Sequence, residues 1–433
     1  MTTPIHFGFF SSFSPPAWQA GSDRMYGSDW WSGEYHARLA QRAEDANFDF
    51  MFFEDTAAVS TTVGGSIDMD LRYALSAPKN DPVALLSYLA GQTTRLGLIA
   101  TASTTLYPPF LLARLYSTID NLSRGRAGWN IVTSSENESA QNFGLDALPP
   151  TNERYEIAEE FLEVVRALWN SWDEDAVVRD QENNVYTDPT KVRAIDHLGK
   201  HFKVRGPLNS LPSPQRTPVF AQAGGSPRGR DFAAQNAELI MSTTIGGVEA
   251  MKAFREDIHG RMKKFGRDPK ECKVMYATHL YVAESRADFR SSITDSQLLS
   301  VLGKHSAHLG VDLNQFPLDE PFPQDVVANG TTSMVESLKD KGRRGQSLRD
   351  AIIDFNWGDD ELGLVGPASD VAQNLVSAME EAGGDGYIIM ATQDANESHL
   401  SGIFDGVVPE LKRLGAMRTD YSGNTLRENL FAF

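Results

Sequence analysis

The chain carries the run Arg95-Leu-Gly-Leu-Ile-Ala-Thr101, then Phe-Leu-Leu-Ala-Arg-Leu-Tyr-Ser-Thr-Ile-Asp-Asn-Leu at 110–122, and then Ala127-Gly-Trp-Asn-Ile-Val132. The first and third runs are short and apolar, as buried strands are, and the middle run is longer and amphipathic, as surface helices are. A strand, a helix and a second strand in this order are typical of an α/β fold with a parallel sheet.

The same alternation continues over most of the chain. It predicts strands at 5–10, 50–53, 95–101, 127–132, 218–221, 239–242, 273–282 and 386–390. It predicts helices at 35–46, 82–93, 110–122, 154–172, 231–236, 248–265, 371–381 and 400–414. A strand followed by a helix about eight times is typical of a (β/α)8 TIM barrel. A Rossmann sheet is disfavoured, because Gly8 stands alone where that fold needs a glycine-rich turn.

Two segments interrupt the alternation. Segment 173–214 is polar and contains prolines, and segment 284–363 has weak periodicity with many Gly, Pro, Ser and Asp residues. We expect one domain over 1–433, with these segments as insertions after strand 4 and after strand 7 that form lids or interfaces. Within the second insertion, 329–349 has the least regular pattern.

Composition restricts partners and location. The 433 residues include 40 Lys and Arg against 58 Asp and Glu, and the net charge of -18 disfavours nucleic acid and anionic membranes as partners. The single cysteine, Cys272, permits no intrachain disulfide, and no apolar run is long enough to span a membrane. Because the first residues also lack the pattern of a signal peptide, we expect a cytoplasmic location.

In a barrel, functional groups gather where the strands end. Those ends carry carboxylates at Glu54 and Asp55 and otherwise hydroxyls, amides and aromatic rings. Glu54 and Asp55 suit acid–base chemistry and a structural hydrogen bond equally well. His305 and His308 are the closest pair among the nine histidines, and their spacing suits an exposed polar helix better than a metal site. We therefore expect no metal.

The fifth predicted strand ends in Gln222-Ala-Gly-Gly-Ser-Pro-Arg-Gly-Arg230, directly before a helix. Glycines let a backbone approach an anion closely, and the N–H groups at the start of a helix bind phosphate. Taken alone, the run fits a phosphate site and an ordinary loop equally well. Combined with an apolar pocket lined by hydroxyls, it suits flavin mononucleotide (FMN), whose ring is flat and mostly apolar and whose tail ends in a phosphate.

Further motifs occur along almost the whole chain. They include Trp129-Asn-Ile-Val-Thr-Ser134, Asn142-Phe-Gly144, Glu153-Arg-Tyr155, Leu168-Trp-Asn-Ser-Trp-Asp-Glu-Asp175 and Tyr421-Ser-Gly-Asn-Thr-Leu-Arg427. Together with the run that ends at Arg230, they resemble the bacterial-luciferase-like flavin monooxygenases. Within that family, the sequence is most similar to the branch of nitrilotriacetate and dibenzothiophene-sulfone monooxygenases.

The resemblance implies a cofactor, a co-substrate and partners. It implies FMN that enters as reduced FMNH2, O2 as co-substrate, and a separate NAD(P)H:flavin reductase that supplies FMNH2 by diffusion. It also implies a homodimer or homotetramer, and a small-molecule substrate.

The resemblance also carries site residues onto this sequence. Positions that match the family's flavin site near the ring are Asp55, Thr101 and Asn130, and those near the phosphate are Tyr155 and Ser226, with backbone donors from Gly229 and Arg230. Positions that match the flavin or substrate pocket of the sulfone enzyme are Phe9, Phe52, Met241 and His308.

Two departures from the family pattern concern histidines. Thr151 stands where the family has a histidine, four residues before the phosphate-binding tyrosine. A hydroxyl can donate one hydrogen bond to phosphate, but it cannot carry a positive charge. The loop after the first strand, Ser11-Ser-Phe-Ser-Pro-Pro-Ala-Trp18, lacks the family's other histidine. His308 is therefore our expected proton-handling residue, and the sulfone substrate is not carried over.

We expect the oxygenase component of a two-component monooxygenase. It would use FMNH2 and O2 to oxygenate a bulky, partly apolar organosulfur, aromatic or other xenobiotic substrate through a flavin peroxide. Aromatic walls would keep the pocket dry, and segment 284–363 would form the lid. The residues expected in these walls are Phe9, Phe10, Phe13, Trp18, Trp30 and Trp31. Two alternatives stay open: a deazaflavin-dependent oxidoreductase on the same barrel, and a non-catalytic flavin-binding protein.

Overall fold

Eight parallel strands close into a barrel. A computed structural model describes residues 4–16, 27–327, 332–357, 361–391 and 396–433. Around the barrel the strands follow the order β1-β14-β11-β10-β9-β4-β3-β2. Their bounds are β1 (His6–Ser12), β2 (Phe50–Glu54), β3 (Gly97–Ser103), β4 (Ala127–Val132), β9 (Val219–Gln222), β10 (Leu239–Thr243), β11 (Lys273–Thr278) and β14 (Gly386–Met390). The predicted α/β TIM barrel is confirmed.

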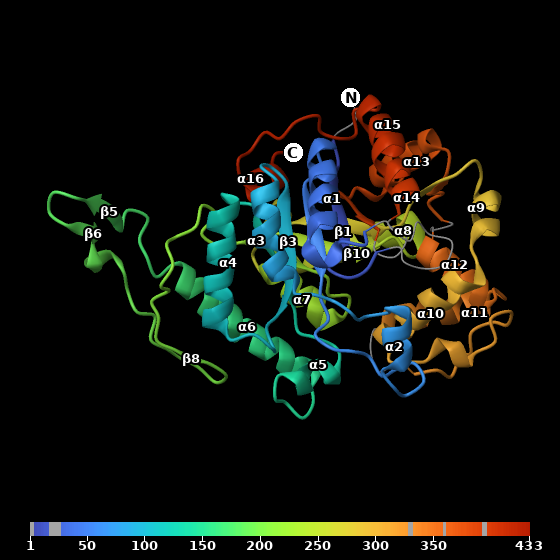
Figure 1. The fold of residues 1–433 in the computed structure, drawn as a ribbon, viewed down its shortest axis with the longest axis horizontal. Helices are drawn as coiled ribbons and strands as arrows, with labels where there is room; N and C mark the ends of the chain where they lie inside the picture. The colour runs from blue at the N-terminus through green and yellow to red at the C-terminus, as the bar shows by residue number, and fades with distance from the viewer. Residues whose placement is uncertain (1–3, 17–26, 328–331, 358–360, 392–395) are drawn as a thin grey trace.

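Helices surround the barrel; most connect one strand to the next, and the last two follow β14 (Figure 1). They are α1 (Glu34–Asp45), α3 (Pro82–Gln92), α4 (Pro109–Ser123), α6 (Thr151–Trp169), α7 (Pro227–Asn236), α8 (Gly247–Lys264), α13 (Ala368–Ala382), α14 (Glu397–Ser401) and α15 (Val408–Arg413). Two short helices, α2 (Asp68–Tyr73) and α5 (Asn137–Asn142), follow the ends of β2 and β4. No helix in the described ranges has the length and apolar character that a membrane span requires.

Several predicted elements have different bounds in the structure, and some of them are divided. The predicted strand 273–282 is two strands, because the chain leaves the barrel after Thr278 and β12 (Tyr281–Val282) pairs instead with β13 (Val365–Gly366). The predicted helix 154–172 begins at Thr151, directly after Pro150, and ends at Trp169. The predicted helix 400–414 is interrupted between α14 and α15 by a π-helical turn at Gly402–Val407.

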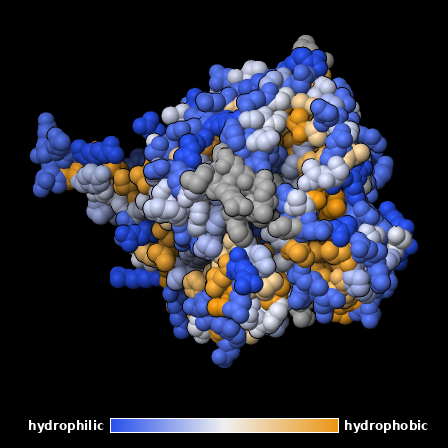
Figure 2. All heavy atoms as spheres, turned by 45° about the vertical axis from the view of Figure 1, so that its right-hand side comes forward, coloured by the Kyte–Doolittle hydropathy of each residue, from blue (hydrophilic) through white to orange (hydrophobic). Residues whose placement is uncertain are grey.

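The first insertion is an arm that projects from the body of the protein (Figures 1 and 2). It contains two small antiparallel pairs, β5 (Val177–Asp180) with β6 (Val185–Thr187) and β7 (His197–Leu198) with β8 (Lys203–Val204). Tyr186 and Leu198 on this arm are 59% and 82% exposed, so the arm carries apolar surface that the chain itself does not cover.

The second insertion has a small apolar core of its own. Its helices are α9 (Arg286–Ser292), α10 (Asp295–Leu309), α11 (Thr332–Arg343) and α12 (Leu348–Trp357). The weak regularity expected for 329–349 is wrong for most of that span, which forms α11. Val335 and Leu338 of α11 pack into the insertion's core, whereas its other faces are charged, which obscures the helical pattern in the sequence.

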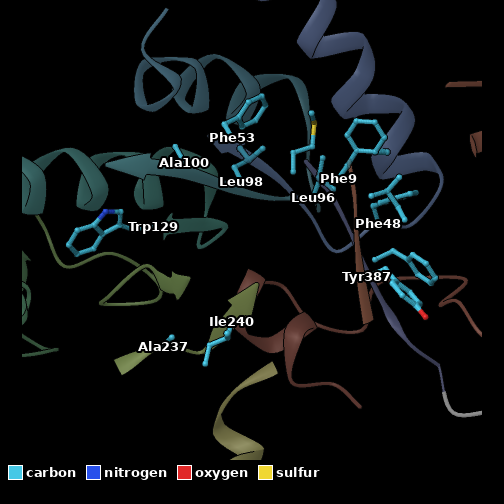
Figure 3. Packing of buried hydrophobic residues seen from close by; sticks show 14 of the residues in the cluster. Phe9, Phe48, Phe53, Leu96, Leu98, Ala100, Trp129, Ala237, Ile240 and Tyr387 are labelled. Atoms are coloured by element: carbon cyan, nitrogen blue, oxygen red, sulfur yellow. The ribbon is translucent and has the colours of Figure 1, made fainter. Parts of the chain in front are cut away.

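Two apolar layers stabilise the barrel. Alternate side chains of a strand point to opposite faces, so neighbouring residues enter different layers. The layer between strands and helices, shown in Figure 3, includes Phe9, Phe48, Phe53, Leu98, Trp129 and Tyr387. The layer inside the barrel includes Phe10, Phe50, Phe52, Ile99, Met275 and Ile388.

The C-terminal helix α16 (Leu426–Leu430) closes the end of the barrel at which the strands begin. Leu426 and Leu430 are fully buried and belong to the apolar cluster inside the barrel. A Cβ atom added to Gly97, at the start of β3, would lie 2.4 Å from the Leu426 side chain. The chain's last residues are therefore part of the barrel core, and the opposite end stays free for a site.

Replacing Leu430 by Ala is expected to lower the free energy of unfolding by about 2–5 kcal/mol, because it leaves a cavity at the closed end of the barrel. Urea denaturation followed by tryptophan fluorescence measures this loss. Leu122→Ala is the matched control: Leu122 is 57% exposed on α4, and its truncation should change stability by less than about 0.5 kcal/mol. A small loss for both variants would show that α16 does not stabilise the barrel.

Candidate active site

Two cavities lie at the carboxyl ends of the barrel strands. Cavity A, of about 390 Å³, lies at the ends of β2, β3, β4 and β9, and Asp55, Thr101, Ser134, Tyr155 and Gly224 are among its lining residues. Cavity B, of about 600 Å³, lies between the ends of β10, β11 and β14 and the helices α10–α12 of the second insertion. This is the end of a barrel at which enzymes of this architecture place their chemistry.

One end of cavity A is built for an anion. Ser226 caps α7, and its Oγ accepts a hydrogen bond from the Gly229 N–H at 3.1 Å. The backbone at Gly224 and Gly229 lies too close to its neighbours for either residue to carry a side chain. A Cβ atom on Gly229 would lie 2.6 Å from the Tyr155 hydroxyl oxygen, and one on Gly224 would lie 3.0 Å from the Gly229 Cα. Tyr155 and Ser226 share a hydrogen bond, so two hydroxyls and a helix start converge at one point.

Arg154 adds a positive charge at this end, and sequence reasoning missed it. Its Nη2 donates to the Thr151 Oγ1 at 3.0 Å, and its Nη1 donates to the Thr133 carbonyl at 3.4 Å. Its Nε is buried without a partner in the described part of the chain. The guanidinium therefore stands beside the hydroxyl that replaces the family's histidine. The signal in the sequence was the Glu153-Arg-Tyr155 motif, in which only Tyr155 was assigned a role.

Two predicted donors at this end are already engaged. The Arg230 backbone N–H donates to the Ser226 carbonyl at 2.8 Å inside α7, and its side chain forms a 3.0 Å ion pair with Asp257 on α8. The prediction of Arg230 as a backbone donor to an anion is therefore wrong. The Gly229 N–H bonds the Ser226 hydroxyl, so Gly229 acts here through its missing side chain.

At the other end of cavity A, register brings two predicted residues together. The pairing of β3 with β4 places Thr101 opposite Asn130. The Asn130 Nδ2 donates to the Thr101 Oγ1 at 2.8 Å, and that hydroxyl donates to the Phe53 carbonyl at 2.9 Å. The Asn130 Oδ1 is buried, and no residue in the described ranges donates to it. A buried acceptor without a donor is costly, so this amide is suited to an N–H group of a ligand.

Asp55 and Glu54 lie side by side but ionise very differently. Burial raises the pKa of Asp55 to about 7, against the opposing effect of Lys79. Burial also opposes the ionisation of Glu54, but Lys79 and Lys304 outweigh it and lower the pKa of Glu54 to about 2. At neutral pH, Glu54 is therefore a carboxylate, whereas Asp55 titrates close to neutral pH.

Cavity B combines apolar and charged walls. Phe10, Met390 and Phe355 form apolar parts of its lining, and Lys304 and Arg344 are among its charged residues. His279, which follows β11, also lines this cavity. Burial, together with the nearby His399 and Lys304, lowers the pKa of His279 to about 3, so its imidazole is neutral at physiological pH. His279 could not be singled out from the sequence, because it lies where a predicted continuous strand breaks.

The residues predicted to line the substrate pocket lie in different parts of the structure. Phe10 lines cavity B and stacks on Phe52, with the two ring centres 5.4 Å apart, and Phe52 is fully buried beneath it. Met241 lies partly buried against the same interior cluster. The prediction for Phe9 is wrong, because Phe9 points out of the barrel toward Phe48 and Phe404, in the layer that Figure 3 shows.

Most of the aromatic residues expected to form the pocket walls do not line either cavity. Phe13 packs edge-on against Trp30 with ring centres 5.8 Å apart, Trp31 is 66% exposed, and none of the three lines cavity A or B. Trp18 lies outside the described residues. His308 falls within α10, but its side chain is also outside the described part of the structure. Among the described residues, no group of three His, Cys, Asp or Glu residues could hold a metal ion.

Comparison with known proteins identifies the family. Residues 5–386 match the family model described as luciferase-like monooxygenase. The chain belongs to this family. Membership makes it a flavin-dependent monooxygenase, and the resemblance drawn from the motifs is confirmed.

Three curated relatives place this luciferase-like monooxygenase in the expected branch. It is 38% identical to the long-chain alkane monooxygenase of Geobacillus thermodenitrificans (strain NG80-2) over 92% of this chain and 86% of the relative. It is 36% identical to the dibenzothiophene-sulfone monooxygenase of Rhodococcus erythropolis, over 93% and 90% of the two chains. It is also 36% identical to nitrilotriacetate monooxygenase component A of Aminobacter aminovorans, over 92% and 89%.

Solved structures agree with this assignment. The crystal structure of long-chain alkane monooxygenase superposes with a TM-score of 0.84 at 33% identity, over 100% of this chain and 96% of that one. A riboflavin lyase crystallised with modified FMN and riboflavin superposes with a TM-score of 0.81 at 27% identity, over 100% and 96%.

The residues present fit FMN in cavity A. The crowded glycines beside Tyr155 exclude side chains, which lets the Tyr155 and Ser226 hydroxyls meet. Asn130 is buried and does not line cavity A, but its Nδ2 donates to the hydroxyl of Thr101, which does line it. The hydroxyls, amide and carboxyl near the ring end and the cation near the phosphate end match the two chemically different parts of the cofactor.

Asp55→Asn is expected to stabilise the ligand-free protein more at about pH 8 than at about pH 5. The pKa of Asp55 is raised from the ordinary 3.8 to about 7 on folding, so the folded state holds this proton more tightly, and stability falls as pH rises from about 4 to about 7. Asn has no proton to lose and avoids that cost. Urea denaturation at both pH values measures the effect, and an equal gain at both would contradict the raised pKa.

Proposed function

We propose that this protein is the oxygenase component of a two-component system that takes up FMNH2 and uses O2 to oxygenate a small organic substrate. The observation that carries the proposal is cavity A, which has the Tyr155 hydroxyl and the start of α7 at one end and Thr101 and Asp55 at the other. Reduced flavin supplies the chemistry that activates O2, and the protein supplies binding, orientation and exclusion of water.

At the phosphate end, we assign binding to Ser226, Tyr155 and Arg154. The two hydroxyls share a hydrogen bond and are ready to turn toward an anion, and the start of α7 adds its dipole. Arg154 offers the positive charge that Thr151 lacks, and the hydrogen bond between the two keeps the guanidinium near cavity A. Thr151 thus acts in this proposal as a support for Arg154.

We propose cavity B as the substrate site. Its volume of about 600 Å³ accommodates a bulky molecule, and Phe10, Phe355 and Met390 suit a partly apolar one. The second insertion covers this cavity, which keeps water from the reacting groups. Organosulfur compounds, aromatic compounds and other xenobiotics remain the proposed substrate classes.

Two histidines are proposed for proton handling. His308 retains the role that the family resemblance implies. His279 lines cavity B with a neutral imidazole, and one of its nitrogens bonds the Met390 carbonyl. The other nitrogen is then suited to exchange a proton with a substrate or with water.

The proposed partner is an NAD(P)H:flavin reductase that supplies FMNH2 by diffusion. One relative is named component A of its monooxygenase, as expected of an enzyme that works with a second component. We also propose a homodimer or homotetramer in which the arm contacts a second copy, because Tyr186 and Leu198 leave apolar surface uncovered. Sedimentation velocity that returned only the 47.7 kDa monomer would oppose this assembly.

The direct test supplies FMNH2 from a separate reductase and follows ¹⁸O2. Incubation with a panel of sulfones, thioethers and aromatic compounds should yield a product with one ¹⁸O atom, detected by mass spectrometry, and His308→Asn should slow its formation without changing FMN affinity. Label in no product, together with hydride transfer from a reduced deazaflavin, would support the oxidoreductase alternative. Tight flavin binding with no O2 consumption would instead identify a non-catalytic flavin-binding protein.

Ser226→Ala is expected to weaken FMN binding by about 1–3 kcal/mol, because it removes one hydrogen bond to a charged phosphate. Tyr155→Phe should have a similar effect. Because both hydroxyls would serve one phosphate, the double variant should lose less than the sum of the single losses, as measured by fluorescence titration. Riboflavin, which lacks the phosphate, is the control ligand and should bind all variants alike. Full additivity would mean that the two hydroxyls do not share a phosphate.

A further inference from the structure

A buried ion pair forms the wall between the two cavities. The Lys79 Nζ lies 2.8 Å from both carboxylate oxygens of Glu54, and the two side chains are 7% and 21% exposed. Lys79 lines cavity A, whereas Glu54 lines cavity B. The ammonium and the carboxylate thus face different compartments while they bind each other.

The backbone around Lys79 is anchored on its C-terminal side. The Asn80 N–H donates to the Phe13 carbonyl at 2.9 Å. Asp81 caps α3, and its Oδ1 accepts from the Val83 N–H at 2.7 Å. These bonds hold the backbone after Lys79, and the ion pair with Glu54 holds its side chain, so that less entropy is lost when Lys79 meets a ligand.

Glu54 does not cancel the charge of Lys79 completely. Lys304, from α10 of the second insertion, also lies close enough to Glu54 to favour its ionisation. Two ammonium groups therefore act on one carboxylate. An ammonium also has three N–H donors, and the two Glu54 oxygens occupy two of those of Lys79.

The other charged residues that line cavity A are acidic. Of the lysines and arginines among the described residues, only Lys79 lines the cavity, and it does so together with Asp55, Asp81 and Glu136. An anion at the ring end would be repelled by these carboxyl groups unless Lys79 offset them. In a poorly solvated wall, such an interaction is stronger than it is in water.

We propose that Lys79 makes cavity A bind reduced FMN more tightly than oxidised FMN. This inference rests on the proposed function. Reduced flavin gives up a ring proton near neutral pH and then carries one negative charge more than oxidised flavin. A cation held in the wall stabilises that additional charge and has little effect on the neutral oxidised ring. An enzyme that receives its flavin by diffusion needs this difference, because it must capture the reduced form and release the oxidised one.

The test compares the affinities of wild-type protein and Lys79→Met for the two redox states. Anaerobic fluorescence titrations give the dissociation constants of oxidised FMN and dithionite-reduced FMN, and their ratio measures the preference. Lys79→Met should lower the preference for reduced FMN about tenfold, chiefly by weakening the reduced complex, which corresponds to a drop of about 30 mV in the two-electron potential of the bound flavin. Glu54→Gln should keep the preference or increase it.

Lys412→Met is the matched control. Lys412 lies on α15, where its Nζ donates to the Asn47 Oδ1 at 2.7 Å, away from the lining of either cavity. The Lys412→Met substitution removes one positive charge, as Lys79→Met does, and should leave the ratio of the two dissociation constants unchanged. If Lys79→Met fails to fold by circular dichroism, Lys79→Gln and Lys79→Arg replace it, and only the arginine variant should keep the preference.

The outcomes separate the inference from the proposed function. An unchanged ratio in folded Lys79→Met, with wild-type protein binding both forms, would overturn the role of Lys79 and leave the flavin site intact. Wild-type protein that binds neither form would overturn the proposed function itself. A lowered ratio in Lys79→Met, with an unchanged one in Lys412→Met, supports the inference.

Discussion

Parallel closure of the barrel constrains every other feature of this structure. Because all eight strands run in one direction, their carboxyl ends meet at one rim, and the residues that follow them converge there. Register then decides which residues become neighbours: pairing of β3 with β4 sets Thr101 opposite Asn130, and pairing of β1 with β2 sets Ser12 opposite Glu54. A slip of one residue would turn these side chains into the outer apolar layer.

The two ends of the barrel serve different purposes as a result. At the end where the strands begin, α16 fills the opening with Leu426 and Leu430. At the other end, α6, α7 and the second insertion build separate compartments around a charged wall.

The barrel could be predicted from the sequence because its strands are short, apolar and evenly separated by helices; Ala127–Val132 and Gly386–Met390 have the predicted bounds. The direction in which each strand side chain points could not be predicted in the same way. Both faces of a parallel strand are buried, so Phe9 and Phe10 look alike in the sequence but point into different layers. Lys79 and His279 gave no local signal, because their surroundings come from distant segments.

The most direct test of this account is a crystal structure of the protein soaked with FMN. The account predicts one FMN in cavity A, with its phosphate against Ser226 and Tyr155 and with its ring against Thr101 and Asn130. An FMN bound in cavity B, or in cavity A with the phosphate at the Thr101 end, would contradict it.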